Sequence, residues 1–246
     1  MNKQALELKN PRVAGSGALS KQIYAVLSDR IVSLSLKPFE QLSEVNVATE
    51  LGVSRTPVRE AFVRLSELGI VDIYPQRGTL VAPIRMPELE KSQFLREALE
   101  LALLRRAMAS GRTAELVGRL RAEIAVQKAF IEVGELQRFY QSDEDFHATI
   151  AEFAGMASVT SEIERVKIHI NRARYLMISG VDDIRLVLEQ HKQIADAIES
   201  NKPSVAEAAM EQHLRRVLEY IGQAQEKFPE YFETNEPARL TRRQKS

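Results

Sequence analysis

Asp143 and His147 are a pair of residues whose types and spacing suggest chemistry. They lie four positions apart, so on a helix they would share one face. That face also carries Tyr140, Ile150 and Ala154, which places both polar side chains on the inward, apolar side. A carboxylate and an imidazole directed into a protein interior can bind a divalent transition metal.

Two further histidines follow the same pattern. His191 and His213 each align with the apolar residues of an expected helix, and each lies eleven residues from position 202, in the loop between those helices. In an antiparallel hairpin the two imidazoles would therefore face each other at the same height. Together with Asp143 and His147 they would form a site of three nitrogens and one oxygen that leaves coordination positions open.

The remaining histidine, His169, falls at the edge of an inward stripe that runs through Ile163, Ile170 and Ala173. We expect it at the surface or at the boundary of the core, and we do not count it as a ligand. A lone histidine on an apolar face is usually a hydrogen-bonded core residue. Three inward histidines with one acid favour a metal site over that interpretation.

Long helices would position these residues. The chain has no proline between Pro87 and Pro203, and four evenly spaced glycines are placed to end helices in the left-handed conformation. These glycines are Gly111, Gly134, Gly155 and Gly180. The pattern predicts an all-helical antiparallel bundle with helices over 88–110, 113–133, 136–154, 157–178, 182–200 and 203–226.

The first 84 residues show a different order of elements. Three expected helices are followed by two β-rich runs joined by a turn, which is typical of a winged helix-turn-helix. The helices are expected over 22–36 and 43–51 and from Ser54 or Thr56 to Gly69, and the β-rich runs over 70–74 and 79–82.

Arginines gather where such a domain would meet DNA. Arg55 and Arg59 share one face at the start of the third helix, where a recognition helix reaches base edges or phosphates. Arg77 and Gly78 at the hairpin tip would place a cation beside the duplex. Arg64 would be solvated or touch a phosphate. The alternative is that these arginines only solvate an exposed helix, but the coincidence of three helices and a wing favours DNA contact.

Composition excludes several classes of protein. The 246 residues are 44% hydrophobic and 28% charged with a net charge of zero, which is ordinary for a globular protein. The absence of cysteine excludes disulfides, thiolate metal sites and cysteine nucleophiles, and fits a reducing cytoplasm. We expect no membrane span and no secretory signal, because no long uncharged stretch occurs.

The predicted fold class is mainly α, with an N-terminal winged helix-turn-helix and a C-terminal all-helical antiparallel bundle. A flexible N-terminal arm and a basic C-terminal tail would flank these two domains, with Arg239, Arg242, Arg243 and Lys245 in a disordered tail. The expected segments are the arm over 1–18, the DNA-binding domain over 19–84, the effector- and metal-binding domain over 85–228 and the tail over 229–246.

The N-terminal motifs resemble the DNA-binding domain of the GntR superfamily of bacterial transcription regulators. The resemblance is carried by LGVSRTPVREA at 51–61 and RGTLV at 77–81. It implies that operator DNA is contacted by residues matching Arg55, Thr56, Arg59 and Gly78. Val45 stands where some relatives have a further DNA-contacting arginine.

The C-terminal motifs resemble the effector-binding FCD domain of the FadR subfamily. These motifs are REALE at 96–100, DEDFH at 143–147, QHKQI at 190–194 and MEQHL at 210–214. The resemblance implies that Asp143, His147, His191 and His213 hold zinc or, alternatively, nickel, manganese or another divalent ion. Met156 and Gln190 depart from the residues that relatives usually have, and neither is a ligand position.

The two sites together predict a ligand-responsive transcription regulator. We expect a cytoplasmic homodimer on a pseudo-palindromic operator, a repressor that is released when a small carboxylate binds at the metal. Arg174, near the inward face of its helix, and Arg96, by resemblance, are candidates for binding this effector; the alternative for each is a surface ion pair.

A metal-dependent hydrolase or lyase acting at the same site is the alternative function. Glu97 or Glu100 could reach the site, but neither is an obvious general base, and an attached DNA-binding domain favours the regulator. A helical scaffold without a ligand is a third possibility, which the histidine cluster disfavours. Release of altered effector would indicate the enzyme, and stoichiometric binding without turnover the regulator.

Overall fold

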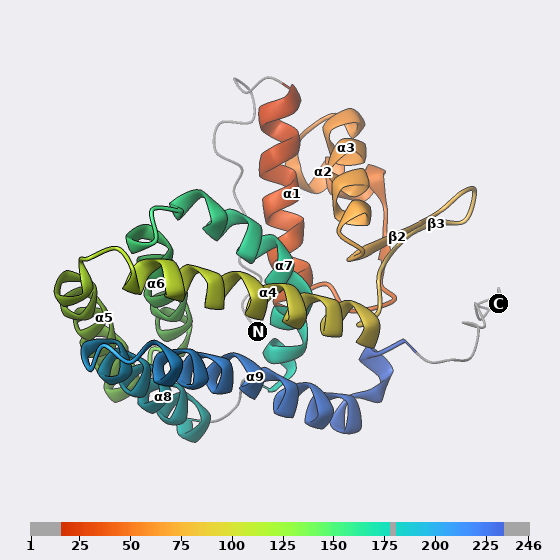
Figure 1. Ribbon diagram of the computed structural model, residues 1–246. Helices are drawn as coiled ribbons and strands as arrows, with labels where there is room; N and C mark the ends of the chain where they lie inside the picture. Colours follow the sequence, from red (N-terminus) through yellow and green to blue (C-terminus); the bar gives the residue numbers. More distant parts are fainter. Residues whose placement is uncertain (1–15, 178–180, 234–246) are drawn as a thin grey trace. The chain divides into compact units, whose positions relative to one another are not determined.

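The computed structural model describes residues 16–177 and 181–233. The chain divides into two compact units, one formed by the residues up to Glu88 and from Ala224 onward, the other by Leu89–Gln223. The first contains three helices and a small sheet, and the second is built from long helices (Figure 1). The expected fold class is therefore confirmed.

The first unit is a winged helix-turn-helix. Its first helix turns Ile23, Leu27 and Ile31 inward, where they are completely buried or nearly so, and it packs along the third helix. The unit comprises α1 (Ser16–Val32), β1 (Gln41–Leu42), α2 (Glu44–Leu51), α3 (Arg55–Glu67), β2 (Val71–Tyr74) and β3 (Gly78–Val81). The first helix thus begins and ends earlier than the sequence pattern predicts, and Ser16 to Ala18 of the expected arm belong to it.

Local chemistry sets the turn between α2 and α3. Ser43 caps α2 by accepting a hydrogen bond from the backbone N–H of Asn46 at 3.3 Å. Gly52 ends the helix with a φ of 66°, a conformation in which a side chain would be strained. Ser54 precedes α3 but its side chain makes no capping bond. This turn fixes the angle at which α3 leaves α2.

The sheet has three antiparallel strands in the order β1-β3-β2. The wing is the β2–β3 hairpin, in which Tyr74 pairs with Gly78. Strand β1 is a finding that sequence periodicity does not predict, because its two residues are too few to show alternation. Leu42 of β1 is buried.

The C-terminal end of the described chain also belongs to the first unit. After the short 3-10 helix η2 (Pro229–Tyr231), Phe232 forms a parallel bridge with Ile84 and is only 3% exposed. Arg85 donates hydrogen bonds to Asp72 at 2.7 Å and to Glu233 at 2.9 Å. Residues 229–233, which the sequence pattern assigns to a tail, are therefore folded here, whereas the expected basic residues from Arg239 to Lys245 lie outside the described residues.

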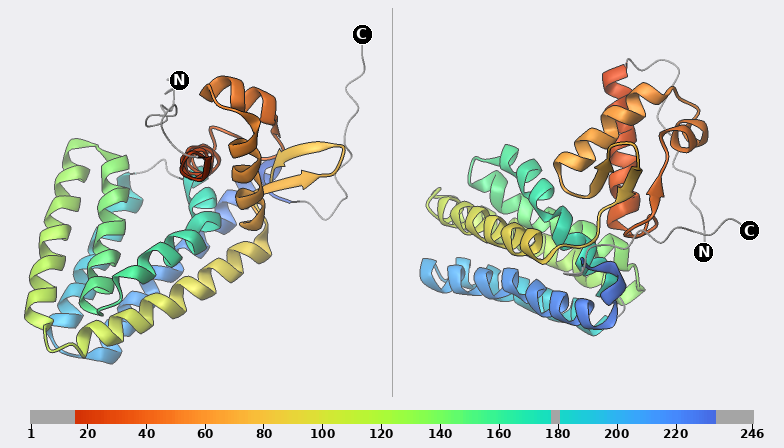
Figure 2. Two further views of the ribbon diagram at one scale, coloured as in Figure 1. Left: turned by 90° about the horizontal axis from the view of Figure 1, so that it is seen from above. Right: turned by 90° about the vertical axis from the view of Figure 1, so that its right-hand side faces the viewer.

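The second unit is a bundle of long helices, seen from two sides in Figure 2. Positive φ angles at Gly111, Gly134 and Gly155 occur where helices were expected to end; Gly180 lies outside the described residues. The elements are α4 (Met86–Met108), α5 (Thr113–Val133), α6 (Leu136–Phe153), η1 (Ala157–Val159), α7 (Thr160–Met177), α8 (Val181–Glu199) and α9 (Pro203–Lys227).

The bundle buries one continuous apolar core, to which Leu104, Leu120, Phe146, Ile194 and Leu214 contribute. The candidate metal ligands lie beside this core on α6, α8 and α9. Among the described residues, no helix is long and apolar enough to cross a membrane.

Candidate metal centre and nucleic-acid interface

The structure brings together the four residues that the sequence pattern singles out as ligands. Asp143, His147, His191 and His213 are all buried, and each can offer one ligand atom such that these atoms lie within 4.8 Å of one another. The imidazole rings of His191 and His213 have centroids 4.7 Å apart, although the residues come from different helices. Phe146 stacks on His191 at 4.0 Å between ring centroids and closes the apolar side of the cluster.

Each histidine ring has an acceptor oxygen near its Nδ1 atom. His191 Nδ1 lies 2.8 Å from Oε1 of Gln127, whose Nε2 in turn donates to the carbonyl of Ser142 at 3.0 Å. That second bond fixes the amide so that its oxygen faces the ring. The imidazole must therefore donate from Nδ1, and its Nε2 carries a lone pair.

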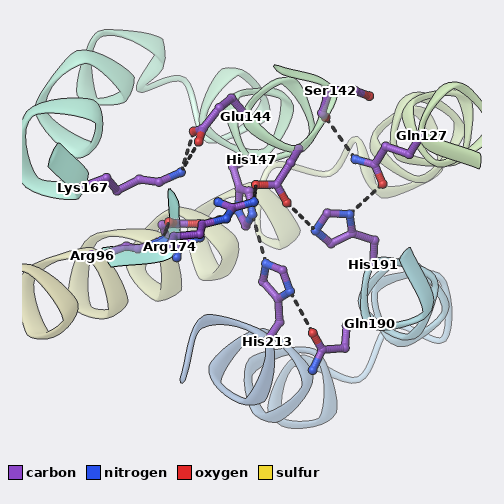
Figure 3. A network of polar contacts seen from close by, with 12 residues as sticks. Arg96, Gln127, Ser142, Glu144, His147, Lys167, Arg174, Gln190, His191 and His213 are labelled. Carbon is purple, nitrogen blue, oxygen red and sulfur yellow. Dashed lines mark hydrogen bonds and ion pairs between the residues drawn. The ribbon is translucent and has the colours of Figure 1, made fainter. Parts of the chain in front are cut away.

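The other two histidines also have an oxygen near Nδ1, and Figure 3 shows the one that Gln190 offers to His213. His213 Nδ1 lies 3.3 Å from Oε1 of Gln190, and His147 Nδ1 lies 2.5 Å from Oε2 of Glu100. Orientation of a ligand histidine by an acceptor on its second nitrogen is the usual way in which proteins prepare a metal site. All three Nε2 atoms are left to face the centre of the cluster.

The donor set fits a divalent metal. His147 Nε2 and His213 Nε2 are 3.1 Å apart, a hydrogen-bond distance at which either ring can donate. If the proton of each ring is on Nδ1 instead, both Nε2 atoms offer a lone pair to a shared cation. The buried His191 Nε2 has no hydrogen-bond partner among the described residues, and Oδ1 of Asp143 is 3.5 Å from it. A cation between these atoms would satisfy all of them, and three imidazoles with one carboxylate suit zinc and similar ions.

A second layer of charged residues surrounds the cluster. Arg174 donates to Oδ2 of Asp143 at 3.2 Å, and its guanidinium lies 4.5 Å above the ring of Tyr140. Arg96 donates to Glu100 at 2.7 Å, and both side chains are buried. The two arginines expected near a ligand thus lie at the cluster, with Arg96 bound to the carboxylate that orients His147.

Burial and charge control the ionisation of the cluster. Burial lowers the pKa of His191 to about 3 and also lowers that of His213, so both imidazoles are neutral near pH 7. Burial opposes ionisation of Asp143, but neighbouring positive charge, foremost that of Arg174, outweighs it and holds the pKa of this carboxyl below its usual range. Neutral imidazoles and an ionised carboxylate are the forms that bind metals.

Three buried polar residues of the bundle were either placed wrongly from the sequence or not singled out at all. His169 was expected at the surface or the boundary of the core, but it is only 7% exposed; it lies outside the ligand cluster. Gln127 and Lys167 were missed. Both continue apolar stripes of their helices, Gln127 after Ile124 and Lys167 after Ile163, so a polar residue at an inward position was the available signal.

The candidate DNA contacts are all exposed on the first unit: Arg55, Thr56, Arg59, Arg64, Arg77 and Gly78. Arg55 and Arg59 converge on one carboxylate, that of Glu44 in the first turn of α2. Arg55 Nη2 donates to it at 2.8 Å, and Arg59 donates through Nε at 3.0 Å and Nη2 at 3.1 Å. These bonds lower the pKa of Glu44, with the larger effect from Arg59. Val45, beside Glu44, is exposed.

An exposed arginine pair at the start of the third helix, beside a wing, defines a DNA-binding domain, and the histidine cluster defines a second, separate site. Comparison with known families agrees with this division. Residues 19–81 match the "Bacterial regulatory proteins, gntR family" model, and residues 93–216 match the FCD domain model. The chain belongs to the GntR family of regulators that carry an FCD domain, and it is a transcription regulator and not an enzyme.

Relatives named as transcriptional repressors match most of the chain. It is 34% identical to the HTH-type transcriptional repressor RspR of Escherichia coli, over 87% of this chain and 93% of the relative. It is 29% identical to a probable D-xylose utilization operon transcriptional repressor of Paenarthrobacter nicotinovorans, over 71% and 76%.

Solved structures share the fold. The E. coli protein McbR/YncC superposes with a TM-score of 0.68 at 20% identity, covering 83% of this chain and 97% of the other. A putative GntR regulator from Rhodococcus gives 0.62 at 21% identity, covering 82% and 97%.

Proposed function

We propose that this protein is a homodimeric, cytoplasmic repressor that leaves its operator when a small organic acid binds beside a divalent metal in the helical bundle. The convergence of three Nε2 atoms and the Asp143 carboxylate at one buried point is the observation that carries the proposal. A bound cation would stabilise this arrangement, because it would accept the lone pairs of the three Nε2 atoms and of the carboxylate.

Asp143, His147, His191 and His213 would hold the metal, with zinc as the first choice for this donor set. The bound metal would supply positions at which a carboxylate oxygen can bind. Arg174 lies next to Asp143 and would bind the same ligand. Arg96 would act through Glu100, which it holds against His147. One relative is named a repressor and a second a probable repressor, which supports the direction of regulation.

The first unit would bind DNA through α3 and the wing. Arg55, Thr56 and Arg59 would enter the major groove, Arg77 and Gly78 would approach the backbone, and Arg64 would touch a phosphate. All six residues are exposed, as this role requires. A two-fold dimer would present two such units to half-sites about one helical turn apart.

Native mass spectrometry of protein purified without chelator tests the metal and the dimer directly. We expect a dimer mass with one divalent ion per chain. His147→Ala, His191→Ala and His213→Ala should lose the ion, and His169→Ala should keep it. If folded protein gave a monomer mass without a bound metal ion, the proposal would be contradicted.

Gel shifts on a duplex selected by the protein from a random library test the DNA interface. Arg55→Ala and Arg59→Ala should abolish specific binding, because each lost bidentate contact to guanine costs about 1–3 kcal/mol. Lys21→Ala, an exposed position on α1, serves as the control. Unchanged binding by both arginine variants would show that α3 does not read the operator.

A further inference from the structure

The residues around the candidate metal ligands carry a balanced set of charges. Lys167 is only 1% exposed, with Nζ 2.7 Å from Oε1 of Glu144. It joins Arg96 and Arg174 in a group of three basic side chains, which Figure 3 shows on the same side of the cluster, away from His191. Each basic side chain forms an ion pair with one carboxylate: Arg96 with Glu100, Lys167 with Glu144 and Arg174 with Asp143.

Within each of the three pairs, the positive charge of the base and the negative charge of the carboxylate cancel. Arg172, another buried base on α7, lies five residues from Lys167 and so points from a different face of the helix than Lys167 and Arg174 do. The three histidines contribute no charge when they act as ligands. With a divalent ion held by Asp143 and the histidines, the buried cluster therefore carries two positive charges that its own residues do not balance.

An uncompensated double charge is costly in a buried site. The ligand that completes the site is therefore expected to bring two negative charges. Among the three bases, Arg174 has the longest contact, 3.2 Å, and makes it through Nη2. A guanidinium has five N–H donors in a planar fork that matches a carboxylate, so Arg174 can keep Asp143 and bind a second acid group.

We propose that the effector is a dicarboxylate, with one carboxylate at the metal and the other on the guanidinium of Arg174. This inference rests on the proposed function and adds the charge of the ligand to it. A monocarboxylate of the same size would leave one positive charge unbalanced and the Arg174 fork unfilled. The site would thus select by charge as well as by shape.

Calorimetric titration of the zinc-loaded protein tests the charge of the ligand. The probes are malonate, succinate, glutarate, malate and tartrate, each compared with its own monoamide, which has nearly the same shape and one charge less. We expect the tightest dicarboxylate to bind at least tenfold more strongly than its monoamide. Arg174→Gln should bring this ratio close to one in samples prepared at saturating zinc, whose zinc content, measured on the same sample, shows that the site is filled.

Controls separate the possible failures. Arg165→Gln, on the exposed side of α7, should keep the full ratio. Arg174→Lys, which keeps the charge but not the fork, should keep part of it. Equal affinity for a dicarboxylate and its monoamide in the unmodified protein would overturn the dicarboxylate proposal alone. A zinc-loaded protein that binds none of the acids, singly or doubly charged, would contradict the proposed function as well.

Discussion

At the residue scale, the three candidate ligand histidines differ in the group that lies at Nδ1: His147 has the carboxylate of Glu100 there. Oε2 of Glu100 lies 2.5 Å from Nδ1 of His147 and Arg96 donates to the same carboxylate, whereas neutral amides lie at Nδ1 of His191 and His213. A carboxylate partner at Nδ1 makes an imidazole a stronger metal ligand, so His147 is the ligand we expect to bind the metal most strongly.

Glu100→Gln should therefore weaken zinc binding by about 10–100-fold, the usual effect of losing such a partner. Competition with a chromophoric chelator measures the change. Glu97→Gln is the matched control, because Glu97 lies one turn away on α4 and forms an exposed ion pair with Arg215 at 2.8 Å. Equal zinc affinity in both variants would show that Glu100 does not tune the ligand.

The contact of Glu44 with both arginines of α3 leads to a second prediction at this scale. Glu44→Gln removes the negative charge and loosens both guanidiniums. Non-specific DNA binding should strengthen and depend more steeply on salt, while the preference for operator over random DNA falls several-fold. Fluorescence anisotropy over a salt series measures both, with the exposed Glu60→Gln as the control. A Glu44 variant with unchanged discrimination would contradict this role.

At the element scale, the helices could be predicted from the sequence, but the two-residue strand β1 and the isolated bridge of Phe232 could not. Glycines such as Gly134 mark helix ends because the left-handed conformation is a local property, and the spacing of Asp143 and His147 fixes a common face. Strand β1 and the bridge from Phe232 to Ile84 depend on partners distant in the sequence. His169 was misjudged because helix periodicity describes the stripe but not what covers the rest of the helix.

The candidate metal ligands come from α6, α8 and α9, so their ionisation should affect the stability of the whole bundle. For His191 the pKa is about 3 in the folded chain and near 6.5 when unfolded, so the unfolded state binds more protons between these values. The free energy of unfolding of metal-free protein should therefore fall as the pH drops from about 6.5 toward 3. The lowered pKa values of Asp143 and Glu100 act in the same direction below about pH 4.

Urea unfolding of chelated protein at pH 7.5 and 5.5 tests this. His191→Gln should lose part of the pH dependence, because it removes one of the groups that titrates. Added zinc should raise the stability at pH 7.5 by RT ln(1 + [L]/Kd), or about 3–4 kcal/mol at several hundred-fold saturation. Stability that does not change between the two pH values would contradict the buried, neutral state of His191 and His213.

At the scale of the whole molecule, the chain passes between its two units twice, near Glu88 in α4 and near Ala224 in α9. Both helices also reach the candidate metal centre, α4 through Glu100 and α9 through His213. The end of α9 is fastened within the first unit by Phe232 and by Glu233 on Arg85. In the proposed function, a change at the candidate metal centre would act on the first unit through these two covalent connections.

Phe232→Ala tests the second connection. Because Phe232 is 3% exposed, its truncation should destabilise the first unit by about 3–5 kcal/mol, as expected for a large buried side chain. Phe94→Ala, at a residue that is 72% exposed, should change the stability by less than about 0.5 kcal/mol.

Below the temperature at which the first unit melts, the Phe232 variant should still bind operator and zinc. Its operator binding should respond less to the acid, because one of the two connections between the units is loose. Differential scanning calorimetry measures the stability and gel shifts with and without the acid measure the response. If the Phe232 variant is destabilised but its operator binding still responds fully to the acid, α4 alone carries the change from the metal site to the first unit. The segment after α9 would then contribute only to stability.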